Sequence, residues 1–170
     1  TLALLAVVSA FALPSLQTTV RRNQVSTEVN RLLSDLLFAR NTAVSRGRVV
    51  TLCRSSDLAS CGGGAAGQYD VGWLTYMATA PRIPLTSGAG FELLKVGDPS
   101  STNLQIRSPG AQAPTYISFQ PNGRIDPAVA GSISVSVCYD GTSTTQVPGK
   151  RIVLSASGRP NVTDVPPGGC

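Results

Sequence analysis

Cysteine and carboxylate side chains are the residues of this 170-residue chain whose types could support chemistry. The sequence contains 4 Cys, 9 Asp+Glu and no His. The absence of histidine excludes Ser-His-Asp and Cys-His nucleophile pairs, His-ligated zinc and an imidazole acid or base. The carboxylates are scattered along the sequence, with no close DxD or ExxE pair. A carboxylate enzyme would need two of them to meet in the fold. The composition therefore argues against an enzyme, and we expect no cofactor and no metal.

The four cysteines form two groups that lie far apart in the sequence, Cys53 with Cys61 and Cys138 with Cys170. Zinc bound by four thiolates usually requires CxxC-like knuckles, and neither spacing supplies one. Two disulfides formed in an oxidising compartment are the better interpretation, which predicts export to the periplasm or the cell exterior. We favour the pairs Cys53–Cys61 and Cys138–Cys170 over the other two pairings, because the second bond would tether the Pro/Gly-rich tail to the rest of the chain.

The elements that position these side chains begin with a stretch that carries no charge. No charged residue occurs from Thr1 to Val20, and the apolar run from Thr1 to Leu13 is interrupted by Pro14. The run is shorter than the roughly 20 residues that a helix needs to cross a bilayer. Three interpretations follow: a signal peptide without its basic region, a buried core helix, or a membrane helix whose start lies outside this chain. The sequence that follows favours the third.

Apolar residues then recur at three- and four-residue steps, which predicts an amphipathic helix. They are Val25, Val29, Leu32, Leu33, Leu36, Leu37, Ala43 and Val44. The polar residues between them, which include Glu28, Arg31 and Asp35, are expected to form the solvated face. No glycine occurs before Gly47, which supplies a stop signal. We expect Pro14 to bend this helix without ending it.

Beyond the helix, short β-type runs alternate with Gly, Pro, Ser and Asn clusters. The expected strands are residues 48–54, 72–78, 91–96, 103–107, 116–120, 132–139 and 151–155. The alternation of apolar residues and serines after Ser132 indicates an antiparallel sheet with one covered face and one solvated face. The apolar side of the helix is the simplest cover. The sequence therefore predicts an α+β fold.

These features together resemble type IV pilins and pseudopilins, and more narrowly the minor pilin group that contains FimU, FimT and GspH. The two Gly-Arg turns, Gly123-Arg124 and Gly158-Arg159, support the resemblance. The segments that carry it are ALPSL (Ala12 to Leu16), EVNRLLSDLLFARNTAVSRGRVVTLC (Glu28 to Cys53), FQPNGRI (Phe119 to Ile125) and RIVLSASGRPNV (Arg151 to Val162).

The resemblance implies a type IV pilin-like fold, in which a long N-terminal helix packs on an antiparallel β-sheet domain with a disulfide-tethered C-terminal tail. Residues 1–20 would be the apolar half of the helix, in the inner membrane before assembly and in the filament core afterwards. Residues 21–47 would be its amphipathic half, and residues 48–170 the globular minor pilin domain. The family's mature chain begins with an N-methylated Phe and a short segment ending in Glu. Neither precedes Thr1, so we expect about eight residues to be missing from the front, which would restore a span of membrane length.

The first functional expectation from the resemblance is a FimU-like minor pilin. Such a protein helps to prime pilus assembly and sits in the tip complex, where it links other minor pilins to the major pilin shaft. Its globular domain would lie in the periplasm, held by a single-pass helix, and then at the cell surface. Loss of the protein would reduce piliation and twitching.

The resemblance leaves two alternatives open. One is a FimT-like DNA receptor for natural transformation, whose Gly-Arg-x-Arg motif is similar to the segment from Gly158 to Asn161, although the second arginine is absent. Its candidate phosphate contacts are Arg124, Lys150, Arg151 and Arg159. The other alternative is a GspH-like pseudopilin of type II secretion.

Overall fold

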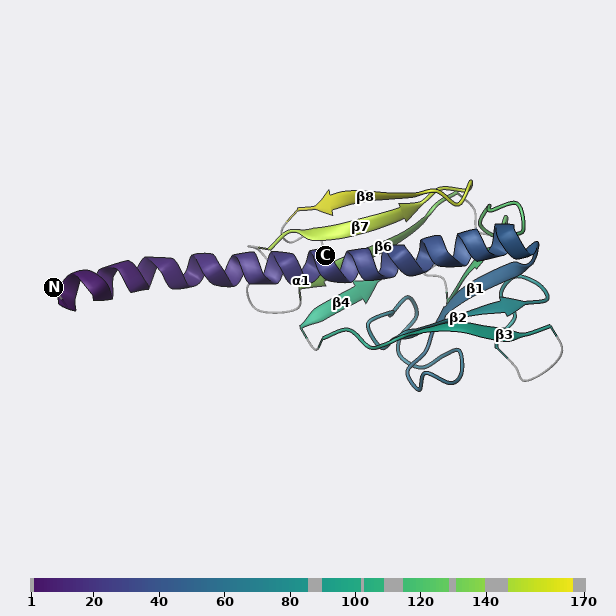
Figure 1. Ribbon diagram of the computed structural model, residues 1–170, viewed down its shortest axis with the longest axis horizontal. Helices are drawn as coiled ribbons and strands as arrows, with labels where there is room; N and C mark the ends of the chain where they lie inside the picture. The colour runs from purple at the N-terminus through teal and green to yellow at the C-terminus, as the bar shows by residue number, and fades with distance from the viewer. Residues whose placement is uncertain are drawn as a thin grey trace.

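The computed structural model describes residues 2–85, 90–101, 103–108, 115–128, 131–139 and 147–166, with side chains from residue 17 onward. One helix, α1 (Leu2–Arg46), opens the chain, and its N-terminal part projects beyond all the strands (Figure 1). The strands are β1 (Val49–Arg54), β2 (Trp73–Ala78), β3 (Glu92–Gly97), β4 (Leu104–Arg107), β5 (Tyr116–Phe119), β6 (Ile133–Tyr139), β7 (Gly149–Leu154) and β8 (Pro160–Val165). The α+β, pilin-like fold class is confirmed.

The strands form two antiparallel sheets, with the strand orders β3-β2-β1-β5 and β4-β6-β7-β8. We call them the first and the second sheet. Helix α1 contacts β1, β2 and β5 of the first sheet and β6 and β7 of the second. In Figure 1, β7 and β8 of the second sheet lie above α1, and β1, β2 and β3 of the first sheet lie below its C-terminal part. A single core therefore runs between the helix and both sheets.

The buried stripe of α1 follows the predicted periodicity. It consists of Val25, Val29, Leu32, Leu36, Ala39 and Ala43. Val44 does not belong to it, because its side chain is 52% exposed. The helix ends where Gly47 adopts a φ of 62° and the backbone N–H of Arg48 donates to the carbonyl of Ala43 over 3.2 Å. This geometry is a Schellman cap, which glycine forms without the steric cost that a Cβ would add.

The central strands β1 and β2 of the first sheet are covered on both faces, which corrects the expectation of one solvated face, whereas the edge strand β3 is largely exposed. Every residue of β2 is buried. Its inner face carries Trp73 and Met77, which belong to the core against α1, while Leu74 and Tyr76 form a second small cluster on the outer face. The second sheet follows the expected pattern more closely, because Ile152 and Leu154 in β7 are buried and Val153 between them is half-buried.

The sequence did not predict β8 as a strand. This strand pairs with β7 over its whole length and forms an edge of the second sheet. Four of its central residues are exposed, so it lacks the alternation of apolar and polar residues that identifies a half-buried strand. It also begins at Pro160, which suits an edge strand but weakens any prediction from sequence.

Candidate interaction surface

The two Gly-Arg turns have the same local construction. In the first, Gly123 N–H donates to the carbonyl of Gln120 over 2.8 Å, and in the second, Gly158 N–H donates to the carbonyl of Ser155 over 2.8 Å. Gly123 and Gly158 have φ values of 76° and 75°. Residues with a Cβ rarely adopt this left-handed backbone conformation. Glycine at these two positions therefore allows the chain to reverse tightly.

The structure brings these two turns together against α1. A Cβ built on Gly158 would lie only 2.0 Å from the carbonyl oxygen of Gly123, so the two backbones are in direct contact. Arg40 of α1 donates from Nε to the same carbonyl over 3.0 Å. The first turn follows β5 and the second connects β7 to β8. This corner therefore joins the helix to both sheets.

The four candidate phosphate contacts divide into two pairs. Arg124 and Arg159 are exposed in the two abutting turns, and neither forms an ion pair among the described residues. Lys150 and Arg151 lie near the opposite end of the β7–β8 hairpin. At about 3.3 Å per strand residue, Lys150 is roughly 13 Å from the end of β7 at Leu154. One compact site of four cations is therefore not formed.

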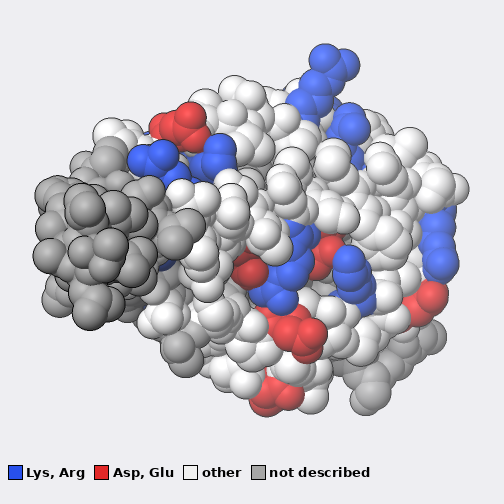
Figure 2. Space-filling model, turned by 60° about the vertical axis from the view of Figure 1, so that its left-hand side comes forward, with Lys and Arg blue, Asp and Glu red and all other residues white. Residues whose placement is uncertain are grey.

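Lys150 and Arg151 also have partners within the second sheet. Lys150 Nζ lies 3.0 Å from a carboxylate oxygen of Asp164, and Arg151 Nε donates to Ser136 Oγ over 2.9 Å. On the face in Figure 2, basic and acidic side chains are interspersed among uncharged ones. No broad basic face appears in this view.

A shallow hollow lies beside Arg124 at the corner of the two turns. Its lining includes Gln120, Asn122, Arg124, Asp126 and Ala156. The carboxylate of Asp126 is already bound, because Arg82 Nε lies 2.6 Å from it and the backbone N–H of Ala128 donates to it over 3.1 Å. The guanidinium of Arg124 lines this hollow and forms no ion pair among the described residues.

A charged and aromatic anchor joins α1 to the first sheet. Asp35 is only 1% exposed, and its carboxylate accepts a hydrogen bond of 2.8 Å from Trp73 Nε1 and pairs with Lys95 of β3. The guanidinium of Arg31 lies 4.5 Å from the centroid of the Trp73 ring. Opposite-charge pairing is what makes a carboxylate tolerable in such a buried position.

Glu28 forms a second polar contact on the same side of α1. Its carboxylate pairs with Arg31 and accepts a hydrogen bond of 2.6 Å from Ser100 Oγ. The expectation that Glu28 and Asp35 belong to the solvated face is therefore wrong. The sequence does indicate that these two carboxylates are buried. Glu28 and Asp35 share the helical stripe of Val25 and Leu32, at spacings of three, four and seven residues.

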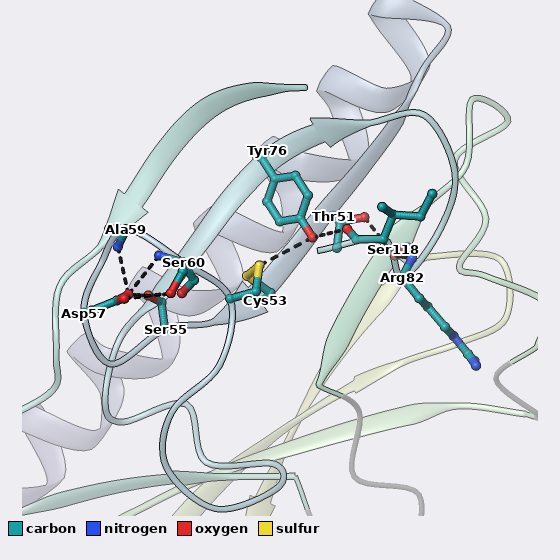
Figure 3. Close-up of a disulfide and its surroundings, with 11 residues drawn as sticks. Thr51, Cys53, Ser55, Asp57, Ala59, Ser60, Tyr76, Arg82 and Ser118 are labelled. Carbon is teal, nitrogen blue, oxygen red and sulfur yellow. Dashed lines mark hydrogen bonds between the residues drawn. A yellow bond between two sulfur atoms is a disulfide. The ribbon is translucent and has the colours of Figure 1, made fainter. Parts of the chain in front are cut away.

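The predicted Cys53–Cys61 disulfide is present on the outer face of the first sheet, with a Cα–Cα distance of 5.7 Å (Figure 3). The Cys61 sulfur lies 3.5 Å from the hydroxyl of Tyr76, which donates to the carbonyl of Ile83 over 2.7 Å. Burial raises the pKa of the Tyr76 phenol. Cys138 is not a free thiol. Its expected partner Cys170 lies outside the described residues, so that pairing stays a prediction.

The loop closed by this disulfide is ordered around Asp57. The carboxylate of Asp57 accepts hydrogen bonds from Ser60 Oγ over 2.6 Å and from the backbone N–H groups of Ser60 and Ala59 over 2.8 Å and 3.0 Å. These bonds, led by that of the Ser60 side chain, hold the pKa of the Asp57 carboxyl well below its usual range. The disulfide and this turn together fix the loop over the sheet.

Three further expectations concern a metal site, a bend at Pro14 and a membrane-spanning helix. Among the described residues, no three His, Cys, Asp or Glu side chains gather where they could bind a metal ion. Helix α1 continues through Pro14, and the predicted bend there stays a prediction. In the part of the chain that the structure describes, no helix has a long enough apolar segment to cross a membrane.

Comparisons with known proteins agree with this architecture. The minor pilin FimU of Pseudomonas aeruginosa superposes with a TM-score of 0.60 at 20% identity, covering 84% of this chain and 90% of FimU. The minor pseudopilin EpsH from the type 2 secretion system of Vibrio cholerae gives a TM-score of 0.54 at 12% identity, covering 82% of this chain and 96% of EpsH. No curated protein sequence matches significantly. At such low identities these structures show the fold alone.

The sequence itself supplies the family. The model of the family described as type II transport protein GspH matches residues 28–158, which is most of the chain. The matched range includes α1 from Glu28 onward, the disulfide loop and the Gly123-Arg124 turn, and it ends at Gly158 in the second turn. Family and fold are those of structural pilins. The chain therefore belongs to the GspH family and is a pilin or pseudopilin of the group that includes FimU and EpsH.

Proposed function

We propose that this protein is a FimU-like minor pilin that helps to prime type IV pilus assembly and sits in the tip complex. The observation that carries the proposal is the projection of the charge-free start of α1 beyond both sheets, while one face of the rest of α1 is buried against them (Figure 1). An apolar helix that its own domain leaves uncovered requires an apolar environment elsewhere. A membrane before assembly and a bundle of pilin helices afterwards would both provide one.

The proposal assigns a role to each part of the chain. Residues 1–20 anchor the subunit in the inner membrane and then enter the filament core, and residues 21–47 carry the globular domain, residues 48–170. Other minor pilins and the major pilin are the partners. The fold superposes more closely on FimU than on EpsH, with TM-scores of 0.60 and 0.54, and the proposal follows that likeness of fold.

A DNA receptor of the FimT kind is the second candidate. The observation that favours it is the pair of exposed guanidiniums, Arg124 and Arg159, in two turns that touch. Lys150 and Arg151 do not join them. Two cations would support only weak phosphate binding with a shallow dependence on salt. A pseudopilin role in type II secretion is the third candidate, which the description of the family supports.

A deletion strain complemented with the full chain separates these roles. Loss of surface pili and of twitching, with secretion intact, is the result expected for the FimU-like role. Normal piliation with lost DNA uptake would support the receptor, and lost protein secretion with normal pili would support the pseudopilin role. Complementation with the Arg124→Gln, Arg159→Gln double variant adds a second criterion. If the protein has the FimU-like role, this variant should restore piliation without any defect in DNA uptake. If it is the DNA receptor, uptake should stay absent in the strain that carries the variant.

A further inference from the structure

The end of the second sheet lies beside the point where α1 leaves the domain. The guanidinium of Arg21 lies over the ring of Tyr139, 5.0 Å from its centroid. Tyr139 is the last residue of β6, and Arg21 is the first charged residue after the charge-free start of the chain. This contact therefore places the end of β6 at the boundary between the uncharged and the charged parts of α1.

The strand register brings two more cations to the same end. Lys150 of β7 lies opposite Val137 of β6, and directly opposed residues point to the same face of a sheet. Tyr139 also points to that face, because alternate residues of a strand do. Arg151 follows on the other face, and Arg22 is exposed on α1. We call Arg21, Arg22, Tyr139, Lys150 and Arg151 the basic collar.

The carboxylates near the collar do not cancel its charge. Asp164 pairs with Lys150, but the Asp164 side chain is 77% exposed, and such a pair is weak in water. Asp140 follows Tyr139 in the sequence and lies outside the described residues. The collar has four cations, so these two carboxylates leave it positive.

We propose that the basic collar binds the anionic headgroups of phospholipids while the subunit is held in the membrane. This inference rests on the membrane stage of the proposed function. Any apolar layer that takes up the charge-free stretch would have Arg21 and Arg22 at its boundary. Lysine and arginine are attracted to an anionic lipid surface, and tyrosine is enriched at the interface. The collar would thereby set the depth and orientation of the globular domain above the membrane.

The position of the collar favours lipid over nucleic acid as its ligand. A DNA site gains from cations that face open solvent, as Arg124 and Arg159 do at the far corner of the domain. Two collar cations, Arg21 and Arg22, instead lie where the uncharged helix segment ends, and Lys150 lies on the sheet face that carries Tyr139, the ring that Arg21 contacts. When that segment inserts, a lipid surface would meet Arg21 and Arg22 at the end of the segment, with Lys150 and Arg151 at the adjoining end of the second sheet.

Vesicle binding by the full chain tests the inference. Binding is measured to neutral phosphatidylcholine vesicles and to vesicles that also contain phosphatidylglycerol, at low and high salt. The test variant is Arg22→Gln, Lys150→Gln. The matched control is Arg124→Gln, Arg159→Gln, which removes the same charge from exposed positions at the opposite corner. Circular dichroism checks that both variants fold like the wild type.

We expect the wild type to prefer the anionic vesicles, and this preference to weaken at high salt. The collar variant should lose roughly fivefold in affinity for anionic vesicles per cation removed, while its binding to neutral vesicles stays unchanged. The control variant should bind both vesicles like the wild type.

Three results would overturn the inference alone: equal wild-type binding to both vesicles, an equal loss in the control variant, or salt-sensitive duplex DNA binding that only the collar variant loses, without any lipid preference. Wild-type binding to neither vesicle would overturn the membrane stage of the proposed function together with this inference.

Discussion

The two sheets contact the same helix through different chemistry. The first sheet adds directional groups to its apolar contacts, since Trp73 and Lys95 both meet the buried carboxylate of Asp35. The second sheet presents mainly apolar side chains, among them Val135 and Ile152. Apolar contacts are non-directional, so they stabilise packing without fixing one position of the helix on the sheet. Hydrogen bonds and ion pairs are lost when the helix shifts relative to the sheet. The comparison indicates that the first sheet sets the position and rotation of α1, and the second mainly adds burial.

The largest expected effect comes from removing the centre of the anchor. Trp73→Ala would delete the ring that lies under Arg31 and donates to Asp35, and it would leave a large cavity. We expect a loss of about 4 kcal/mol in the free energy of unfolding. Urea denaturation of the full chain in detergent, followed by circular dichroism, measures it. Val135→Ala in the second sheet is the comparison, and a cost equal to that of Trp73→Ala would remove the distinction between the sheets.

The next effect concerns the corner where both sheets meet. Gly158→Ala would place a Cβ 2.0 Å from the carbonyl oxygen of Gly123, at a φ of 75°. We expect a loss of about 3 kcal/mol, because neither backbone can retreat without disturbing the contact with Arg40. The same denaturation experiment measures the loss. Gly131→Ala, which has a similar φ but nothing within 4 Å, is the matched control and should cost only about 1 kcal/mol.

A smaller effect separates charge from hydrogen bonding within the anchor. Asp35→Ala would leave Trp73 Nε1 without its acceptor and Lys95 without its partner, and we expect a loss of about 2 kcal/mol. Lys95 is 44% exposed and can be solvated, so the cost stays below that of a fully buried pair. Asp35→Asn keeps an oxygen acceptor for Trp73. If Asp35→Asn lowers the denaturation midpoint as much as Asp35→Ala does, the ion pair with Lys95, and not the hydrogen bond from Trp73, dominates the anchor.

The smallest effect comes from an exposed ion pair on the same side of α1. Arg46 Nη1 lies 3.0 Å from a carboxylate oxygen of Glu92, and both side chains are 50% exposed. Arg46→Ala should cost at most about 0.5 kcal/mol, because solvent screens the pair. A thermal melt of the variant at low and high salt checks this value. A cost comparable to that of Asp35→Ala would show that burial is not what makes the anchor strong.

Two errors in the sequence-based expectations have physical causes. The sequence pattern does not reveal β8, because an edge strand with exposed residues needs no apolar alternation and pairs with β7 through its backbone. The carboxylates of Glu28 and Asp35 were assigned to solvent because charge usually marks the wet face of a helix. Their burial depends on Ser100 and Lys95, which are distant in sequence and meet them only in the folded chain.

Local sequence patterns are enough to predict most of the individual elements of this protein. The helical period of α1, the glycine that ends it, seven of the strand positions and the short disulfide loop all follow from interactions between near neighbours. Four features depend on long-range packing and could not be predicted from these patterns. They are the division into two sheets, the buried anchor at Asp35, the contact of the two Gly-Arg turns, and the separation of Arg124 and Arg159 from Lys150 and Arg151. These features join residues from distant segments, and the packing of both sheets around one helix sets which of them meet.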